Sequence, residues 1–170
     1  GNGMPIDDYL IHQGFSVTGI DISQEMLKYA QTNVDFTNTY CEDFLTITIS
    51  DTFDAIVCWC MLFHLHADQH DAALLKMRHC LNNEGILCIT FADQNAALTT
   101  DGYQQIDPFT ILSTQFGQSF YHSARPYTDN ITRVQQAGFE ILDSFIDQPG
   151  NHVIIAKKIA ITSKLKQRIY

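Results

Sequence analysis

The sequence predicts an α/β fold with a mostly parallel sheet, helices on both of its faces and an antiparallel hairpin at its C-terminal end. From Met4 to Phe91, strand-like apolar runs alternate with stretches of helical periodicity, which indicates βαβ crossovers. Near the end, two apolar runs flank the turn signal Pro149-Gly150-Asn151, and strands joined by so short a turn are antiparallel. With 170 residues, 45% of them hydrophobic, we expect a single domain over residues 1–170.

A proline and a glycine predict the first elements. We expect a helix over Met4–Gln13, because Pro5 suits the first turn, where its missing N–H does no harm, and Gly14 suits the end. The run that follows predicts a strand over Phe15–Ile20, closed by Asp21.

The second helix begins after a serine. Ser23 is a good N-cap for a helix that runs to about Thr32. Its buried face is expected to comprise Met26, Leu27 and Ala30. A weaker strand over Thr37–Cys41 follows.

Two buried strands and a helix are predicted next. Phe53–Cys60 is nearly all apolar, as expected of a strand covered on both faces in a parallel sheet. Asp68 is expected to cap a helix that runs to Leu81 and buries residues at helical spacing, namely Leu74, Met77 and Leu81. Residues 82–85 break this helix before a buried strand over Gly85–Phe91.

The pattern lapses after Phe91. Residues 92–126 are rich in Gln, Thr and Asp but carry several aromatic side chains, and so long an insertion is interpreted as a cap over a substrate pocket. A helix over Thr128–Ala137, stopped by Gly138, then precedes the hairpin strands, Glu140–Asp147 and His152–Lys158. Residues 159–170 form a basic tail.

Charge and composition exclude several classes of protein. Nineteen acidic and five basic residues precede Lys157, giving −14, and five basic residues from Lys157 onward give +5. So acidic a body repels phosphate backbones, so nucleic acid is not expected as a partner. No apolar run reaches about 18 residues, so no membrane-spanning helix is expected. Gly1–Leu10 does not read as a secretory signal, and the five cysteines lie mostly in apolar runs, which predicts a cytoplasmic protein without disulfides or a metal site.

Residues suited to a nucleotide follow the chain start and the first strand. Gly1 and Gly3 precede a helix, whose free N–H groups can bind an anion or a carboxylate. Asp21, at the end of the next strand, is placed to accept hydrogen bonds from a ribose diol, although it could simply cap a helix.

The ends of two later strands extend this pattern. Asp43 could accept a hydrogen bond from an exocyclic amine, with the ring of Phe44 near an adenine. Cys58–His64 ends the predicted strand that begins at Phe53, beside the crevice where open α/β sheets bind ligands.

Taken in order, these segments resemble the motifs of class I S-adenosylmethionine-dependent methyltransferases. The matching segments are GNGMP, VTGIDIS, CEDF, FDAIVCWCMLFHL, LNNEGILCITF and QQAGFEIL, and they cover Gly1 to Lys158. The resemblance implies a Rossmann-like methyltransferase sheet, S-adenosylmethionine as the cofactor and methyl transfer as the activity.

The resemblance also implies roles for individual residues. Gly1 and Gly3 would lie under the methionine part of the cofactor, and Cys58 and Trp59 would close that side. Asp21 would hold the ribose hydroxyls, and the adenine would be bound by Ile22, Asp43 and Phe44.

Two departures from the family pattern stand out. The family's glycine motif begins one strand earlier, so the first, central strand is absent from this chain, and we expect residues upstream of Gly1 to supply it. The alternative is a compromised fragment with two unpaired strand edges. The family's Pro-Gly-Gly turn is Asn-Asn-Glu-Gly here, which keeps Gly85 at the permissive position.

Two other functions are compatible with parts of the pattern. A nicotinamide-dependent oxidoreductase would need a glycine in place of Ile6, and the antiparallel ending fits it poorly. A non-catalytic cofactor-binding domain of the same fold is the other alternative.

Histidines are the candidate bases for methyl transfer to a hydroxyl or an acidic carbon. His64 and His122 are proposed for this role, although His64 could equally be a half-buried histidine with a backbone partner. Tyr121 and Arg125 are expected to line the acceptor pocket, whereas His66 and His70 are expected on the surface. A small-molecule acceptor is predicted; the oligomeric state and the methylated atom are left open.

Overall fold

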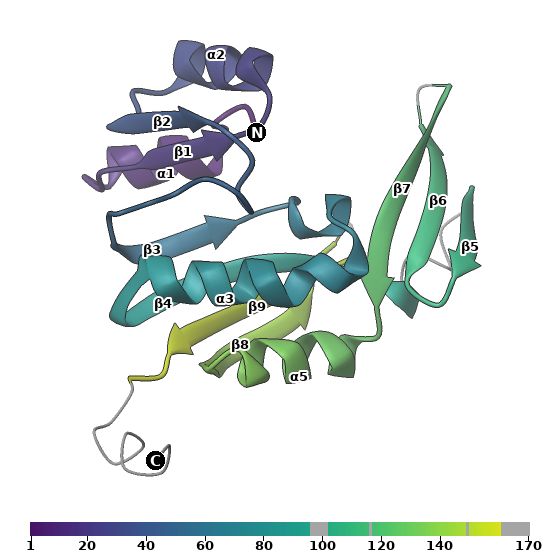
Figure 1. The fold of residues 1–170 in the computed structure, drawn as a ribbon. Coiled ribbons are helices and arrows are strands. Elements are labelled where there is room, and N and C mark those ends of the chain that lie inside the picture. Colours follow the sequence, from purple (N-terminus) through teal and green to yellow (C-terminus); the bar gives the residue numbers. More distant parts are fainter. Residues whose placement is uncertain (96–101, 116, 149, 161–170) are drawn as a thin grey trace. The chain divides into compact units, whose positions relative to one another are not determined.

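The computed structural model describes residues 1–95, 102–115, 117–148 and 150–160 (Figure 1). The chain divides into two compact units, residues 1–48 and residues 49–170. The first contains a two-stranded sheet and the second a seven-stranded sheet. The expectation of a single domain over residues 1–170 stays a prediction.

The first unit alternates helices and parallel strands. Its elements are α1 (Ile6–His12), β1 (Thr18–Asp21), α2 (Gln24–Asn33) and β2 (Asn38–Cys41). β1 and β2 are parallel, with Asp21 opposite Cys41 at their carboxyl ends. This register brings the residues that follow both strands to the same edge of the sheet.

The buried stripe of α2 differs by one residue from the prediction. Ser23 is the N-cap, and its Oγ accepts a hydrogen bond from the Met26 backbone nitrogen at 3.3 Å. Leu27, Ala30 and Val34 are buried at spacings of three and four residues. The expected burial of Met26 is wrong: its side chain is 37% exposed, because it lies at the border of that stripe.

The second unit is built on the mixed sheet. Its strands are β3 (Phe53–Cys58), β4 (Leu81–Asp93), β5 (Tyr103–Asp107), β6 (Thr110–Gln115), β7 (Gln118–Arg125), β8 (Phe139–Ile146) and β9 (Asn151–Lys158). Their order is β5-β6-β7-β4-β9-β8, with β3 also paired to β4. β3 and β7 run parallel to β4, whereas β9 is antiparallel to both β4 and β8. The predicted fold class, including its closing hairpin, is confirmed.

The helices of the second unit follow β3 and β7. They are the 3-10 turns η1 (Leu62–His64) and η2 (Ala67–Gln69), α3 (His70–Cys80) and α5 (Tyr127–Gln136). Asp68 does not cap α3 as predicted, because η2 takes up residues 67–69 before the helix begins. Its Oδ1 instead lies 2.9 Å from His66 Nδ1.

The core of the second unit lies between α3 and the central strands. The predicted burial of Leu74, Met77 and Leu81 is confirmed. Alternate residues of β4 are fully buried beside them, namely Leu87, Ile89 and Phe91. In contrast, β3 is not covered along its length: Asp54, Ala55 and Val57 are exposed. β3 pairs with β4 alone in this sheet and forms its edge.

Strands, rather than an irregular loop, make up most of the described part of residues 92–126. β5, β6 and β7 form an antiparallel meander. The end of β7 joins β4 through the pairs Ala92–Ala124 and Asp93–Arg125. The interpretation of this segment as a cap stays a prediction, and residues 161–170 of the basic tail lie outside the described residues. Among the helices that the structure describes, none has the length and apolar character needed to cross a membrane.

Candidate functional site

Asp21 ends β1 with both carboxylate oxygens engaged. Oδ2 accepts a hydrogen bond from the Gly1 nitrogen at 2.7 Å, and Oδ1 accepts one from the Ser23 backbone at 2.8 Å. The hydrogen bond donated by the Ser23 backbone stabilises the ionised form of this carboxylate. The group is therefore held ionised and keeps further acceptor positions, since a carboxylate offers about four.

The two glycines at the chain start differ in their surroundings. A Cβ added to Gly1 would meet nothing within 4 Å, so the space beside it is open. A Cβ added to Gly3 would come within 2.7 Å of Val34 Cγ2, and Gly3 has a φ of +79°. Gly3 is thus required by its own backbone and by its packing on α2.

Asp43 lies just after β2, on the same sheet edge as Asp21. Its Oδ1 accepts a hydrogen bond from the Leu45 backbone at 2.8 Å. Its backbone carbonyl accepts hydrogen bonds from the backbone nitrogens of Thr46 and Ile47 and from the Thr46 hydroxyl. Among the described residues, the second carboxylate oxygen of Asp43 has no hydrogen-bond partner, so it can accept a donor from a ligand.

Apolar side chains flank the two aspartates. Ile22, directly after Asp21, is 74% exposed, so its side chain is available to a ring. Cys41 Sγ donates to the Ile22 carbonyl at 3.7 Å and ties the ends of β1 and β2 together. Phe44 is half-buried. The first unit therefore holds six of the predicted cofactor residues: Gly1, Gly3, Asp21, Ile22, Asp43 and Phe44.

Cys58 and Trp59, predicted on the methionine side, belong to the second unit. Cys58 is buried at the end of β3, and burial raises the pKa of its thiol to about 12. This thiol is therefore a neutral packing group. Trp59 is 40% exposed.

A cavity of about 100 Å³ brings together three predicted site residues of the second unit. It is lined by His64, Leu65, His66, Ala67, Thr110, Tyr121, His122 and Ser123. The imidazole centroids of His64 and His122 are 5.5 Å apart, and His122 Nε2 lies 2.8 Å from Ser113 Oγ. His64, Tyr121 and His122 thus line one cavity, and their roles in catalysis and acceptor binding stay predictions.

The electrostatics of this cavity favour neutral imidazoles. Burial lowers the pKa of His64, and burial together with the neighbouring His64 lowers the pKa of His122. Both rings are therefore uncharged near neutral pH, the state in which histidine accepts a proton.

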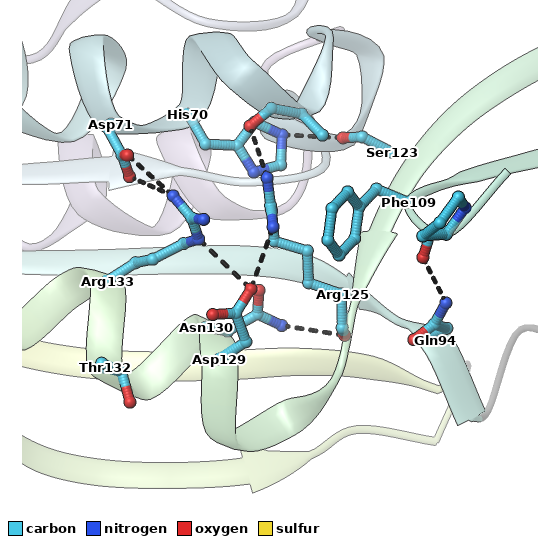
Figure 2. Close-up of polar contacts among 12 residues, drawn as sticks. His70, Asp71, Gln94, Phe109, Ser123, Arg125, Asp129, Asn130, Thr132 and Arg133 are labelled. Atoms are coloured by element: carbon cyan, nitrogen blue, oxygen red, sulfur yellow. Dashed lines mark hydrogen bonds and ion pairs between the residues drawn. The ribbon is translucent and has the colours of Figure 1, made fainter.

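Arg125, predicted to line the acceptor pocket, is not among the residues that line this cavity. Its side chain is buried, with Nη1 3.0 Å from Asp129 Oδ2 and Nη2 3.0 Å from the Ala67 carbonyl (Figure 2). The guanidinium also lies 4.0 Å above the centroid of the Phe109 ring. Arg133 extends the network to Asp71, which it contacts at 2.6 Å and 2.7 Å. Arg125 therefore fastens β7 to η2 and α5.

His70 was predicted on the surface, and this is wrong: it is 1% exposed. The first residue of α3 is turned inward, where its Nε2 lies 2.7 Å from Ser123 Oγ (Figure 2). The polar residues on either side concealed this burial, since hydrophobic periodicity identifies apolar faces and gives no signal for a buried polar residue.

The described residues contain no group of three His, Cys, Asp or Glu side chains suited to a metal ion.

The chain is similar in sequence to methyltransferases. The family model described as "Methyltransferase domain" matches residues 1–85, half of the chain. An "Uncharacterized methyltransferase" of Alkaliphilus oremlandii is 32% identical over 81 residues. Those residues are 48% of this chain and 38% of that protein, so the match spans well under half of the relative's length.

Solved structures share the fold. An S-adenosylmethionine-dependent methyltransferase from Clostridium acetobutylicum superposes with a TM-score of 0.76 at 14% identity, over 94% of this chain and 81% of the other. A 1,6-didemethyltoxoflavin-N1-methyltransferase from Burkholderia thailandensis, with bound 1,6-didemethyltoxoflavin and S-adenosylhomocysteine, gives 0.70 at 18% identity, over 94% and 69%. At such identities the likeness establishes the fold.

Proposed function

Because the chain belongs to the methyltransferase domain family, we propose that it transfers a methyl group from S-adenosylmethionine to a small-molecule acceptor. The proposal rests above all on Asp21 and Asp43, two carboxylates at the carboxyl ends of adjacent parallel strands. Ligands bind at this edge in open α/β sheets.

The residues of the first unit fit the cofactor. The ionised carboxylate of Asp21 would accept hydrogen bonds from the ribose hydroxyls, and the unpartnered oxygen of Asp43 would accept one from the adenine amine. The exposed side chain of Ile22 would pack on the adenine ring. The open space beside Gly1 would admit the methionine part, with Cys58 and Trp59 as further cofactor-binding residues.

The cofactor, when bound, supplies a methyl group already activated by a sulfonium, so the chain's residues need only align the acceptor, exclude water and remove a proton. His64 and His122 would perform the last step, since their lowered pKa values leave both imidazoles unprotonated near neutral pH. Tyr121, which lines the same cavity, would contact the acceptor.

A small, uncharged acceptor suits this cavity. Its volume is about 100 Å³, and its lining has no carboxylate, lysine or arginine. The aromatic rings of Phe63 and Phe120 lie 5.6 Å and 6.5 Å from that of His122, which favours a partly apolar compound. The net charge of −9 supports an acceptor other than nucleic acid.

Calorimetric titration of the full-length protein with S-adenosylhomocysteine tests the proposal, with NAD and NADP as controls. We expect binding of S-adenosylhomocysteine alone, and binding weakened at least about 10-fold in Asp21→Asn, because one charge-assisted hydrogen bond contributes roughly 1.5–3 kcal/mol. Asp35→Asn removes an exposed carboxylate of the same unit and should leave the affinity unchanged. Binding of NAD instead, or of neither compound by the folded protein, would refute methyl transfer.

A further inference from the structure

His70 touches both walls of the cavity that contains His64 and His122. Its Nε2 lies 3.0 Å from the carbonyl oxygen of Leu62, in the turn η1 that ends at His64. The same nitrogen lies 2.7 Å from Ser123 Oγ, on β7, directly after His122. One imidazole thus joins the turn that carries the first histidine to the strand that carries the second.

The hydrogen-bond chemistry fixes where the single imidazole proton lies. The Leu62 carbonyl can only accept, so Nε2 carries the hydrogen and shares it between that carbonyl and Ser123 Oγ. The Ser123 hydroxyl then donates to the Phe63 carbonyl at 3.4 Å. Both ends of this short chain of hydrogen bonds finish on carbonyls of η1, so it holds η1 and β7 together.

The surroundings keep His70 in this neutral state. Burial, assisted by the nearby Arg125 and Arg133, lowers the pKa of His70 to about 4, with Asp71 opposing. Nδ1 has no hydrogen-bond partner among the described residues, so a proton there would be an unsatisfied buried donor. Protonation of the ring is therefore costly, and the arrangement of donors stays unchanged across the neutral range.

We propose that His70 is a positioning residue, whose buried imidazole holds His64 and His122 on opposite walls of one cavity. This inference rests on the proposed function, because it assigns those two histidines to the acceptor side of the reaction. His70 itself does not line the cavity, so it acts on the cavity only indirectly, through Ser123 and η1.

The test is an NMR titration of histidine side chains in the full-length protein, with resonances assigned through His64→Gln and His122→Gln. Besides the pair itself, His66 and Tyr121 are the titratable groups that line the cavity. In the unaltered protein we expect both histidines to titrate below the ordinary value of about 6.5. In His70→Leu, which loses both hydrogen bonds, both should move up toward that value, because the walls separate and water enters. His70→Gln retains a donor amide at the position of Nε2 and should restore the lower values.

His152→Leu is the matched control. It removes an equally buried imidazole, whose nitrogens lie 2.8 Å from Ser144 Oγ and 3.3 Å from Asn130 Nδ2, away from the cavity. The titrations of His64 and His122 should then stay as they were. Unchanged titrations in folded His70→Leu, or an equal shift in His152→Leu, would overturn the proposal.

A second variant covers the case in which His70→Leu does not fold. Ser123→Ala breaks the link to β7 and leaves the imidazole in place, so His122 should shift more than His64. No shift would again overturn the positioning role. Binding of S-adenosylhomocysteine is measured on the same samples: its absence refutes the proposed function, while the histidine titrations still decide the role of His70.

Discussion

Gly3 offers a sharp test of why a glycine stands beside the proposed cofactor residues. In Gly3→Ala the new Cβ would lie 2.7 Å from Val34 Cγ2, whereas carbon atoms in ordinary contact lie about 3.5–4.0 Å apart. Val34 is 7% exposed, so it has little room to move away. The backbone also has a φ of +79°, which alanine adopts at a cost of roughly 1–2 kcal/mol.

The magnitude follows from these two costs. Overpacking a closed site costs about 1–3 kcal/mol, so Gly3→Ala should lower the free energy of unfolding by roughly 2–5 kcal/mol. Val34→Ala removes the clashing methyl group and by itself should cost about 2 kcal/mol through lost burial and a cavity. In the double variant the clash is gone. Its loss of unfolding free energy should therefore be about 1–3 kcal/mol smaller than the sum of the losses in the two single variants.

Urea denaturation followed by circular dichroism measures this coupling in the four proteins of the cycle. The affinity for S-adenosylhomocysteine should follow the same pattern, falling in Gly3→Ala and recovering in part in the double variant. Strict additivity of the unfolding free energies would refute the packing argument. A double variant that binds as poorly as Gly3→Ala would show that the glycine serves the approach of the ligand instead.

Three further predictions concern stability. Ser23→Ala should lower the free energy of unfolding by about 1 kcal/mol, because it removes the acceptor at the start of α2; Ser23→Asp, another good cap, should restore it in the same urea assay. Asp129→Asn should cost roughly 1–2 kcal/mol more than Asp71→Asn, because it weakens the pairing of the buried Arg125, whereas the Asp71 side chain is 61% exposed; equal costs would count against the network. The buried His70 and His152 both have pKa values lowered to about 4, so the unfolded chain, with values near 6.5, binds more protons between these two limits. The free energy of unfolding should therefore be highest above about pH 6.5 and should decrease as the pH drops toward 4. In His152→Leu, urea titrations across this range should show a smaller decrease of the free energy of unfolding with falling pH.

Outside residues 92–126, the order of the main helices and strands could be predicted because they have local signals. Ser23 caps α2, Gly138 follows α5 with a φ of +90°, and a turn separates β8 from β9. The carboxyl ends of β1 and β2 could be paired because parallel strands align there, which brought Asp21 and Asp43 to one edge.

Other features depend on contacts between residues distant in sequence. The burial of His70 is decided by Leu62 and by Ser123, which lies 53 residues further along the chain, and nothing in the helix pattern of α3 indicates it. The buried position of Arg125 likewise depends on distant residues, because the Phe109 ring and Asp129 contact its guanidinium. The strands β5 to β7 were missed because burial does not follow apolar character there: Ser113, Ser123 and Arg125 are buried, whereas Phe120 and Tyr121 are exposed. A cytoplasmic location stays a prediction.

The narrow junction between β7 and β4, two residue pairs long, has a consequence for how relatives of this chain diversify. Tyr121 and His122 belong to β7, whereas Asp21 and Asp43 belong to the first 48 residues. Under the proposed function, recombination or insertion within the meander would therefore change the acceptor side while the codons for the proposed cofactor residues are inherited intact. Grafting residues 102–125 from a relative with another acceptor is the corresponding laboratory test of that division.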